Sequence, residues 1–172
     1  MIKIDRPNLN DAPSWYKSFF DLAKGNNLIE ALEKNRQDTL DLIASIPSDL
    51  ENHRYAEGKW TIKQVFIHLC DEERYYAYKA FCLSRQTNVL LEIPMSESYT
   101  KDFNVTGRAL NDIAWEFETV RNATISLLST MTLEMLDFKF PGEEPYTARS
   151  LGWFTVGHNE HHCRLVRERY LV

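Results

Sequence analysis

Three of the five histidines in this 172-residue chain lie within five residues, in the segment GHNEHHCRLVRERY at 157–170. His158 and His162 are four residues apart, so on a helix they differ by about 40° around the axis and stand one turn apart. Two imidazoles with this spacing can both bind one metal ion, as they do in zinc sites built on helices. His161 lies near the edge of the same face. The segment therefore predicts a metal site with His158 and His162 as ligands.

A third ligand should come from another helix, because two histidines rarely complete a transition-metal site. His68 is the candidate, since it lies in the middle of a predicted helix on the border of its apolar face. Asp71 follows three residues later on nearly the same side. Its carboxylate could accept the free N–H of an imidazole or bind the ion. We interpret Asp71 as a catalytic residue that orients His68 or assists proton transfer, and we expect His53 at the surface.

These residues also have a simpler interpretation. A histidine on an apolar helix face is more often a hydrogen-bonded core residue than a ligand, and an i, i+4 pair of histidines can arise by chance. The run DEER at 71–74 is typical of a solvated helix face, which weakens the case for Asp71. The zinc-protease motif is disfavoured, because Glu160 does not directly follow His158 and would point about 200° away from it.

The elements that must position these side chains are predicted to be helices. The apolar residues recur with helical periodicity nearly throughout, and no stretch alternates convincingly as a strand. A short helix should begin at an N-cap on Ser14 and stop at Gly25, and Thr61 with Gln64 forms a capping box. The long helices are expected at 27–46, 61–85, 107–131 and about 147–170. Four such helices pack most simply as a four-helix bundle, so we expect an all-α fold with one domain over 1–172.

Composition narrows the class of protein. Hydrophobic residues make up 44% and charged residues 26%, as in a soluble globular domain. The net charge of −5 argues against a basic surface that would bind the nucleic-acid backbone. The sequence has neither an apolar run of about 20 residues for a membrane span nor the apolar core of a secretion signal, and its three cysteines form no disulfide framework. We therefore expect a cytoplasmic protein that binds neither nucleic acid nor a membrane.

Two segments resemble signatures of the DinB-like family, which is also called the YfiT-like family. Residues 55–85 are similar to its first signature and residues 157–171 to its C-terminal signature, and residues 12–32 resemble the N-terminal part of one branch. The order agrees as well, with one histidine in the second long helix and a His-x-x-x-His pair in the last. Many relatives continue after the last histidine with Arg-Gly-Gln, where this chain has Cys163, Arg164 and Leu165. The loop at 91–104 also lacks the Gly-Phe-Asp of many close relatives.

The resemblance implies an up-down-down-up bundle with a divalent metal ion, usually zinc or nickel, held at positions that correspond to His68, His158 and His162. Family members with assigned activities include S-transferases that join low-molecular-weight thiols to electrophiles. Many other members are known only as metal-dependent hydrolases, and dimers are common. We therefore expect a metal-dependent S-transferase or hydrolase that acts on a small molecule. The alternative is a non-catalytic bundle that binds metal for stability or sensing. The sequence leaves the oligomeric state open between a monomer and a homodimer, and exposed aromatic residues near Trp15 and Tyr16 are the candidates for a contact between two copies.

Overall fold

The computed structural model describes residues 2–87, 105, 107–142 and 145–172, and every regular element within these residues is helical. The bundle consists of α2 (Leu28–Ser45), α3 (Ile62–Ser84), α5 (Leu110–Ser129) and α7 (Ala148–Leu165), and α7 continues as a π-helical turn, Val166–Tyr170. Shorter elements are α1 (Lys17–Leu22), α6 (Leu133–Asp137) and 3-10 turns at Leu9–Asp11, Ser14–Tyr16 and Ser48–Leu50. The expected all-α four-helix bundle is therefore confirmed.

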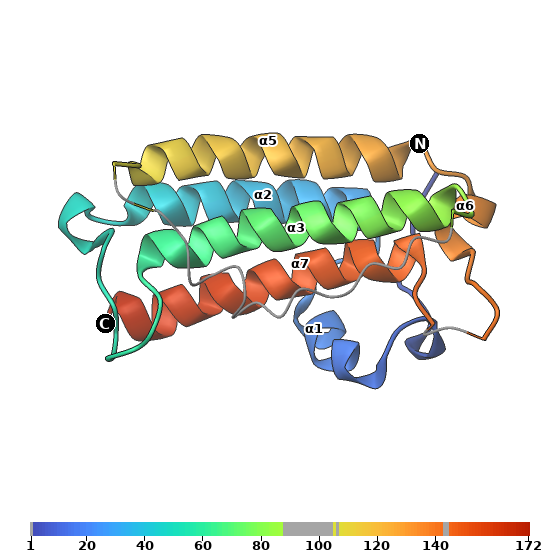
Figure 1. The fold of residues 1–172 in the computed structure, drawn as a ribbon, viewed down its shortest axis with the longest axis horizontal. Coiled ribbons are helices and arrows are strands. Elements are labelled where there is room, and N and C mark those ends of the chain that lie inside the picture. Colours follow the sequence, from blue (N-terminus) through green and yellow to red (C-terminus); the bar gives the residue numbers. More distant parts are fainter. Residues whose placement is uncertain (1, 88–104, 106, 143–144) are drawn as a thin grey trace.

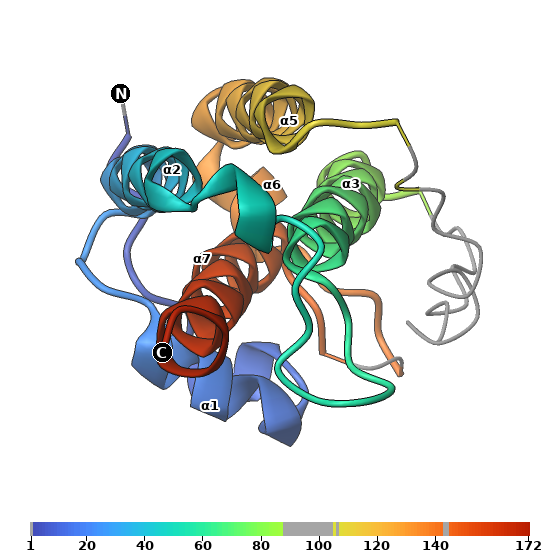
Figure 2. The ribbon, with the colours of Figure 1, turned by 90° about the vertical axis from the view of Figure 1, so that its left-hand side faces the viewer.

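The four long helices have the up-down-down-up arrangement. Figure 1 shows that α2 and α7 run in one direction and that α3 and α5 run in the other. Seen along the bundle in Figure 2, α2 lies across from α3, and α5 lies across from α7. Accordingly, α2 and α3 each pack mainly against α5 and α7. The antiparallel contact between α3 and α7 brings the first half of α3 against the second half of α7.

Capping boxes fix the first turns of the two helices that carry the candidate ligands. At the start of α3 the Gln64 backbone N–H donates to Thr61 Oγ1 (3.2 Å), and the Thr61 N–H donates to Gln64 Oε1 (2.9 Å). At the start of α7 the Ser150 N–H donates to Thr147 Oγ1, and the Thr147 N–H donates to Ser150 Oγ, both at 3.0 Å. Each box satisfies two backbone donors that the helix cannot satisfy itself. The predicted box at Thr61 is confirmed.

The N-terminal region differs from the prediction at its helix ends. Ser14 does not cap a helix, because the chain turns immediately after Pro13, where the Tyr16 N–H donates to the Pro13 carbonyl oxygen (2.9 Å). The helix α1 ends at Leu22, whereas Gly25 (φ +91°) lies in the turn that leads to α2. Tyr16 is fully buried and stacks on Phe154, with ring centroids 4.0 Å apart. Tyr16 is therefore not available for a contact with a second copy of the chain, whereas Trp15 is 48% exposed.

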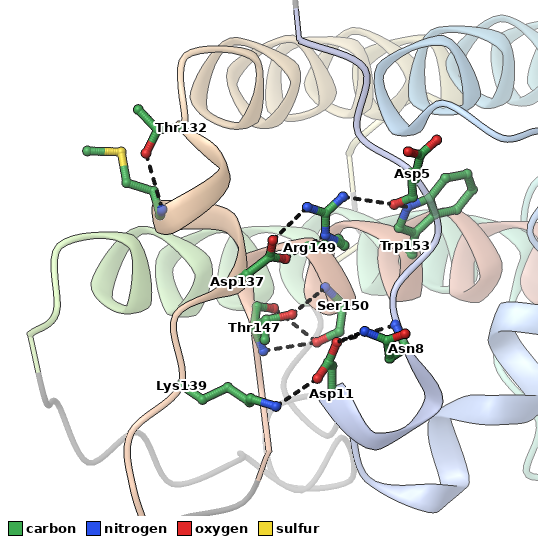
Figure 3. Close-up of polar contacts among 11 residues, drawn as sticks. Asp5, Asn8, Asp11, Thr132, Asp137, Lys139, Thr147, Arg149, Ser150 and Trp153 are labelled. Atoms are coloured by element: carbon green, nitrogen blue, oxygen red, sulfur yellow. Dashed lines mark hydrogen bonds and ion pairs between the residues drawn. The ribbon is translucent and has the colours of Figure 1, made fainter.

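A network of polar contacts holds the N-terminal segment against the start of α7 (Figure 3). Arg149 forms a two-pronged ion pair with Asp137 at the end of α6, with N–O distances of 2.6 and 2.8 Å. Arg149 also donates to the Asp5 carbonyl oxygen (3.2 Å), and Trp153 Nε1 donates to the same oxygen (2.9 Å). The short helix α6, which the sequence did not predict, supplies the carboxylate of this network. None of the described helices is long and apolar enough to span a membrane.

Candidate metal centre

The structure brings the three predicted histidines together at the contact between α3 and α7. His158 Nε2 lies 3.3 Å from His68 Nε2 and 3.1 Å from His162 Nε2. One ligand atom from each ring can be chosen so that all three lie within 4.8 Å of one another. His68 comes from the second turn of α3, and the other two come from consecutive turns of one face of α7. We call these three residues the histidine cluster.

Aromatic side chains hold the three rings of the histidine cluster in place. His68 and His162 are buried, and His158 is half-buried. The Trp60 ring contacts the His68 ring (4.7 Å between centroids) and lies nearly parallel to the His162 ring (6.4 Å, 22°). Phe154 stacks on His158 (5.4 Å, 16°). Because packing limits rotation of the rings, their Nε2 atoms are directed at one another before any ligand binds.

The rings of the histidine cluster are neutral at physiological pH. Burial lowers the pKa of His68 to about 4. Burial is also the largest cause that lowers the pKa values of His158 and His162 well below the ordinary value, and repulsion from neighbouring rings adds to it. Neutral imidazole is the form that binds a metal ion. The site therefore needs no proton release from these rings before it can bind one.

The donor set fits a divalent metal ion better than it fits hydrogen bonds between the rings. A neutral ring has one N–H and one lone pair, yet His158 Nε2 faces two other ring nitrogens. The Nδ1 atoms of His68 and His162 are buried without a protein partner among the described residues. Nitrogen ligands about 2.0–2.1 Å from a tetrahedral zinc ion stand about 3.3 Å apart. The observed separations of 3.1 and 3.3 Å are close to this value.

Comparison with known proteins agrees with this arrangement. A model of the DinB superfamily matches residues 31–166, a range that includes all three histidines. The chain belongs to the DinB superfamily. The structure is also similar to that of YfiT from Bacillus subtilis, which is described as a probable metal-dependent hydrolase with an unusual four-helix bundle topology. That match has a TM-score of 0.68 and 14% identity, and it covers 94% of this chain and 91% of YfiT, so it shows a shared fold. No curated protein matches the chain.

The helix α1, which precedes the range matched by the DinB model, also reaches the histidine cluster. A Cβ atom on Gly157 would lie 1.9 Å from the Phe19 carbonyl oxygen, so only glycine at this position allows α1 to pack so closely on α7. The Phe19 ring then lies 5.8 Å from the His158 ring and 5.7 Å from the His161 ring, between centroids. His161 is exposed and lies outside the cluster, as expected, and His53 is exposed too.

The predicted contact between Asp71 and His68 is not present in this DinB protein. The Asp71 carboxylate instead accepts a hydrogen bond from Arg74 (3.2 Å), and Arg74 also pairs with Glu116 on α5 (2.6 Å). Three residues along a helix correspond to about 300°, so Asp71 is rotated by about 60° from His68. That rotation is enough to direct the carboxylate towards α5. Burial is the largest cause that raises the pKa of Asp71, and Arg74 opposes it.

Sequence reasoning missed a second buried polar cluster, formed by Arg121, Glu73 and Asn35. Arg121 is fully buried and binds both carboxylate oxygens of Glu73 (2.8–3.0 Å) and the side-chain oxygen of Asn35 (2.8 Å). We call it the arginine cluster. The sequence contained a signal for this cluster. Arg121 lies four residues after Phe117 and Glu73 lies four residues after Leu69, so each charged residue falls on the apolar face of its helix. Charged residues on apolar stripes are rarely buried unless they are paired.

Proposed function

We propose that this DinB protein is a divalent-metal-dependent enzyme that activates a nucleophile for reaction with a small molecule. His68, His158 and His162 would hold the ion, which we propose to be zinc or nickel. The observation that supports this most strongly is the convergence of three neutral Nε2 atoms, 3.1 and 3.3 Å apart in the two contacts of His158. Imidazole ligands suit both metals, so the donor set does not choose between them.

The chemistry of such a centre depends on the charge that the protein leaves on the ion. A divalent ion held by three neutral imidazoles keeps its full charge and an open position, so it lowers the pKa of a water molecule or thiol bound there. The protein itself contributes by holding the three imidazole rings with their Nε2 atoms directed at one another. Trp60 covers His68 and His162, whereas His158 is half-buried. We infer that a small molecule approaches from the side of His158.

Within this class we propose thiol-dependent S-transfer, with hydrolysis as the second candidate. In S-transfer a low-molecular-weight thiol would release its proton to solvent water, its sulfur would attack an electrophilic carbon, and an S–C bond would form as the leaving group departs with the bonding electrons. The resemblance of the two histidine-bearing segments to the DinB-like family supports this choice. Hydrolysis is supported by the structural likeness to YfiT and would use water at the same position.

Metal content tests the site itself. We expect about one equivalent of zinc or nickel per chain in the wild type after loading and dialysis, and a loss of bound metal in His162→Ala. His161→Ala is the matched control, because His161 is the neighbouring residue on the same helix but is exposed and lies outside the histidine cluster. Negligible metal in the wild type, or equal metal in both variants, would contradict the proposal.

Activity tests the reaction class. Metal-loaded protein is mixed with a panel of low-molecular-weight thiols and a reactive aryl halide, and separately with a nitrophenyl ester without thiol. Conjugation that requires both metal and thiol would support S-transfer, whereas ester cleavage without thiol would support hydrolysis. If neither occurs and chelation lowers the melting temperature strongly, the ion has a structural role, and the non-catalytic alternative holds.

A further inference from the structure

A small cavity lies between the histidine cluster and the arginine cluster. It has a volume of about 10 Å³ and is lined by Leu69, Glu73 and Tyr76 of α3 and by Thr155, His158 and Asn159 of α7. About 10–15 Å³ of this kind of space is the minimum for one water molecule. The cavity is therefore too small for a substrate, and a single water molecule is the largest ligand that it accepts.

The walls of the cavity carry polar groups that can still form a hydrogen bond with a water molecule. Asn159 is 1% exposed, and the Thr39 hydroxyl lies 2.9 Å from its Oδ1, but its Nδ2 has no partner among the residues that the structure describes. Whichever way the amide is oriented, one polar end faces Thr39 and the other end needs a partner. Glu73 Oε1 accepts only one of the three hydrogen bonds that the carboxylate takes from Arg121, so it can accept another. Empty cavities in proteins are apolar, and this one is not.

We propose that one water molecule occupies this cavity and joins His158 to Asn159 and Glu73. The water accepts the Nδ1–H of His158, bonds the free end of the Asn159 amide, and donates to Glu73. This contact selects the tautomer of His158 whose Nε2 lone pair faces His68 and His162. Histidines that bind metals usually donate their other N–H to a carboxylate, a carbonyl or a water, and losing such a partner weakens metal binding about 10–100-fold.

The bridge makes Asn159 and Glu73 positioning residues for the histidine cluster. Arg121 fixes Glu73 through both carboxylate oxygens, so the acceptor at the far end of the bridge does not move. Within the described part of the chain, His68 and His162 have no such partner at Nδ1. His158, the half-buried member, is thus the ligand whose orientation the bundle interior controls. The expected effect on zinc affinity rests on the proposed function, because it requires that the histidine cluster binds metal. The presence of the water molecule does not depend on the proposed function.

Crystallography tests the water directly. A high-resolution structure of the wild type should show one ordered water within hydrogen-bond distance of the Asn159 amide, a Glu73 carboxylate oxygen and His158 Nδ1. A dry cavity, or a water that contacts neither Asn159 nor Glu73, would overturn the inference. This result does not depend on whether the protein binds metal or on whether any variant folds.

The consequence for His158 is tested with Asn159→Leu and a matched control, Thr124→Val. Thr124 is also buried and bonds within its own helix, to the Val120 carbonyl oxygen (3.1 Å), but it lies on α5 and does not line this cavity. Zinc affinity, measured by competition with a chromophoric chelator, should fall about tenfold or more in Asn159→Leu and by less than about twofold in the control. Nitrogen-15 NMR of the metal-free protein should show His158 protonated at Nδ1 in the wild type and a mixture of tautomers in Asn159→Leu.

Three outcomes separate this inference from the proposed function. Wild-type zinc affinity and an unchanged His158 tautomer in Asn159→Leu would overturn the bridge and leave the metal site standing. Equal losses of affinity in Asn159→Leu and Thr124→Val would show a general loss of packing and would also overturn it. A wild type that binds no metal would contradict the proposed function, while the crystallographic water and the tautomer would still decide the bridge.

Discussion

The histidine cluster and the arginine cluster are two buried polar groups in one bundle, and they differ in how far each satisfies itself. In the arginine cluster all three guanidinium nitrogens make hydrogen bonds, to Glu73, to Asn35 and to the Leu32 carbonyl oxygen (3.2 Å). In the histidine cluster three neutral nitrogens face one another, and two Nδ1 atoms have no protein partner among the described residues. The first cluster ties α2, α3 and α5 together with groups that the chain supplies.

This difference distinguishes a buried polar group that stabilises the fold from one that is preorganised to bind a ligand. Burial of a polar group destabilises a fold unless the group is hydrogen-bonded, so a cluster that completes its own bonds needs nothing further. A cluster whose members cannot complete each other's bonds is explained only by something that binds there. Departures from internal consistency are expected at functional sites.

The largest expected effect comes from breaking the arginine cluster. Arg121→Leu should lower the free energy of unfolding by about 3–5 kcal/mol, because it leaves the Glu73 carboxylate buried without its cation. Urea denaturation measures the change. Lys34→Ala is the control, since Lys34 forms an exposed ion pair with Asp38 on α2 and its loss should change stability by less than about 1 kcal/mol. A loss as small as that of the control would show that the arginine cluster does not stabilise the bundle.

Binding of a metal ion to the histidine cluster should stabilise the folded protein. At a free zinc concentration about 100 times the dissociation constant, binding should stabilise the native state by about 2.7 kcal/mol. Thermal unfolding with and without zinc measures this, and the increase should disappear in His162→Ala. In Arg121→Leu, measured relative to its own metal-free form, the increase should be smaller, because Arg121 fixes the Glu73 carboxylate that the proposed water bridge uses. An equal increase would show that the two clusters act separately and would count against the bridge. An increase that persists in His162→Ala would place the metal elsewhere.

Acid should destabilise the metal-free protein through the histidine cluster. The pKa of His68 is about 4 in the folded state and about 6.5 in the unfolded chain, so the unfolded chain binds more protons between these values. Stability is therefore present above about pH 6.5 and is lost as the pH falls towards 4, by about 2 kcal/mol between pH 7 and pH 5 for this ring. Urea denaturation of the metal-free protein across that range should show a smaller pH dependence in His68→Leu. Equal pH dependence in both proteins would contradict the lowered pKa.

The smallest effect is expected from replacing a histidine with an apolar residue when no metal is present. His68→Leu at pH 7 should change the stability of the metal-free protein by less than about 1 kcal/mol. His158 Nε2 keeps its contact with His162 Nε2 (3.1 Å), and His68 Nδ1 has no partner among the described residues that the substitution would remove. Urea denaturation with a chelator present measures the change. A loss approaching that of Arg121→Leu would mean that the rings satisfy one another, and the contrast between the two clusters would fail.

Much of the candidate site could be predicted from local sequence. The spacing of His158 and His162 placed both on one face of a helix, and the Thr61 box located the start of α3 and thus the depth of His68. Asp71 shows the limit of this reasoning. Its spacing from His68 was compatible with a contact, but a rotation of about 60° directs it to Arg74 and the neighbourhood of α5. Spacing along one helix does not say which neighbouring helix supplies the competing partner.

By itself the sequence determined the helices, the apolar stripes and the side of each helix on which the histidines lie, because these follow from backbone hydrogen bonding and a period of 3.6 residues. Only the tertiary structure decided that His68 meets the pair on α7, that Arg121 meets Glu73, and that a cavity separates the two groups. Those contacts depend on how far each helix is rotated and shifted against its neighbours. Rotation and shift are set by the packing of all the buried side chains together, so no single segment contains the information.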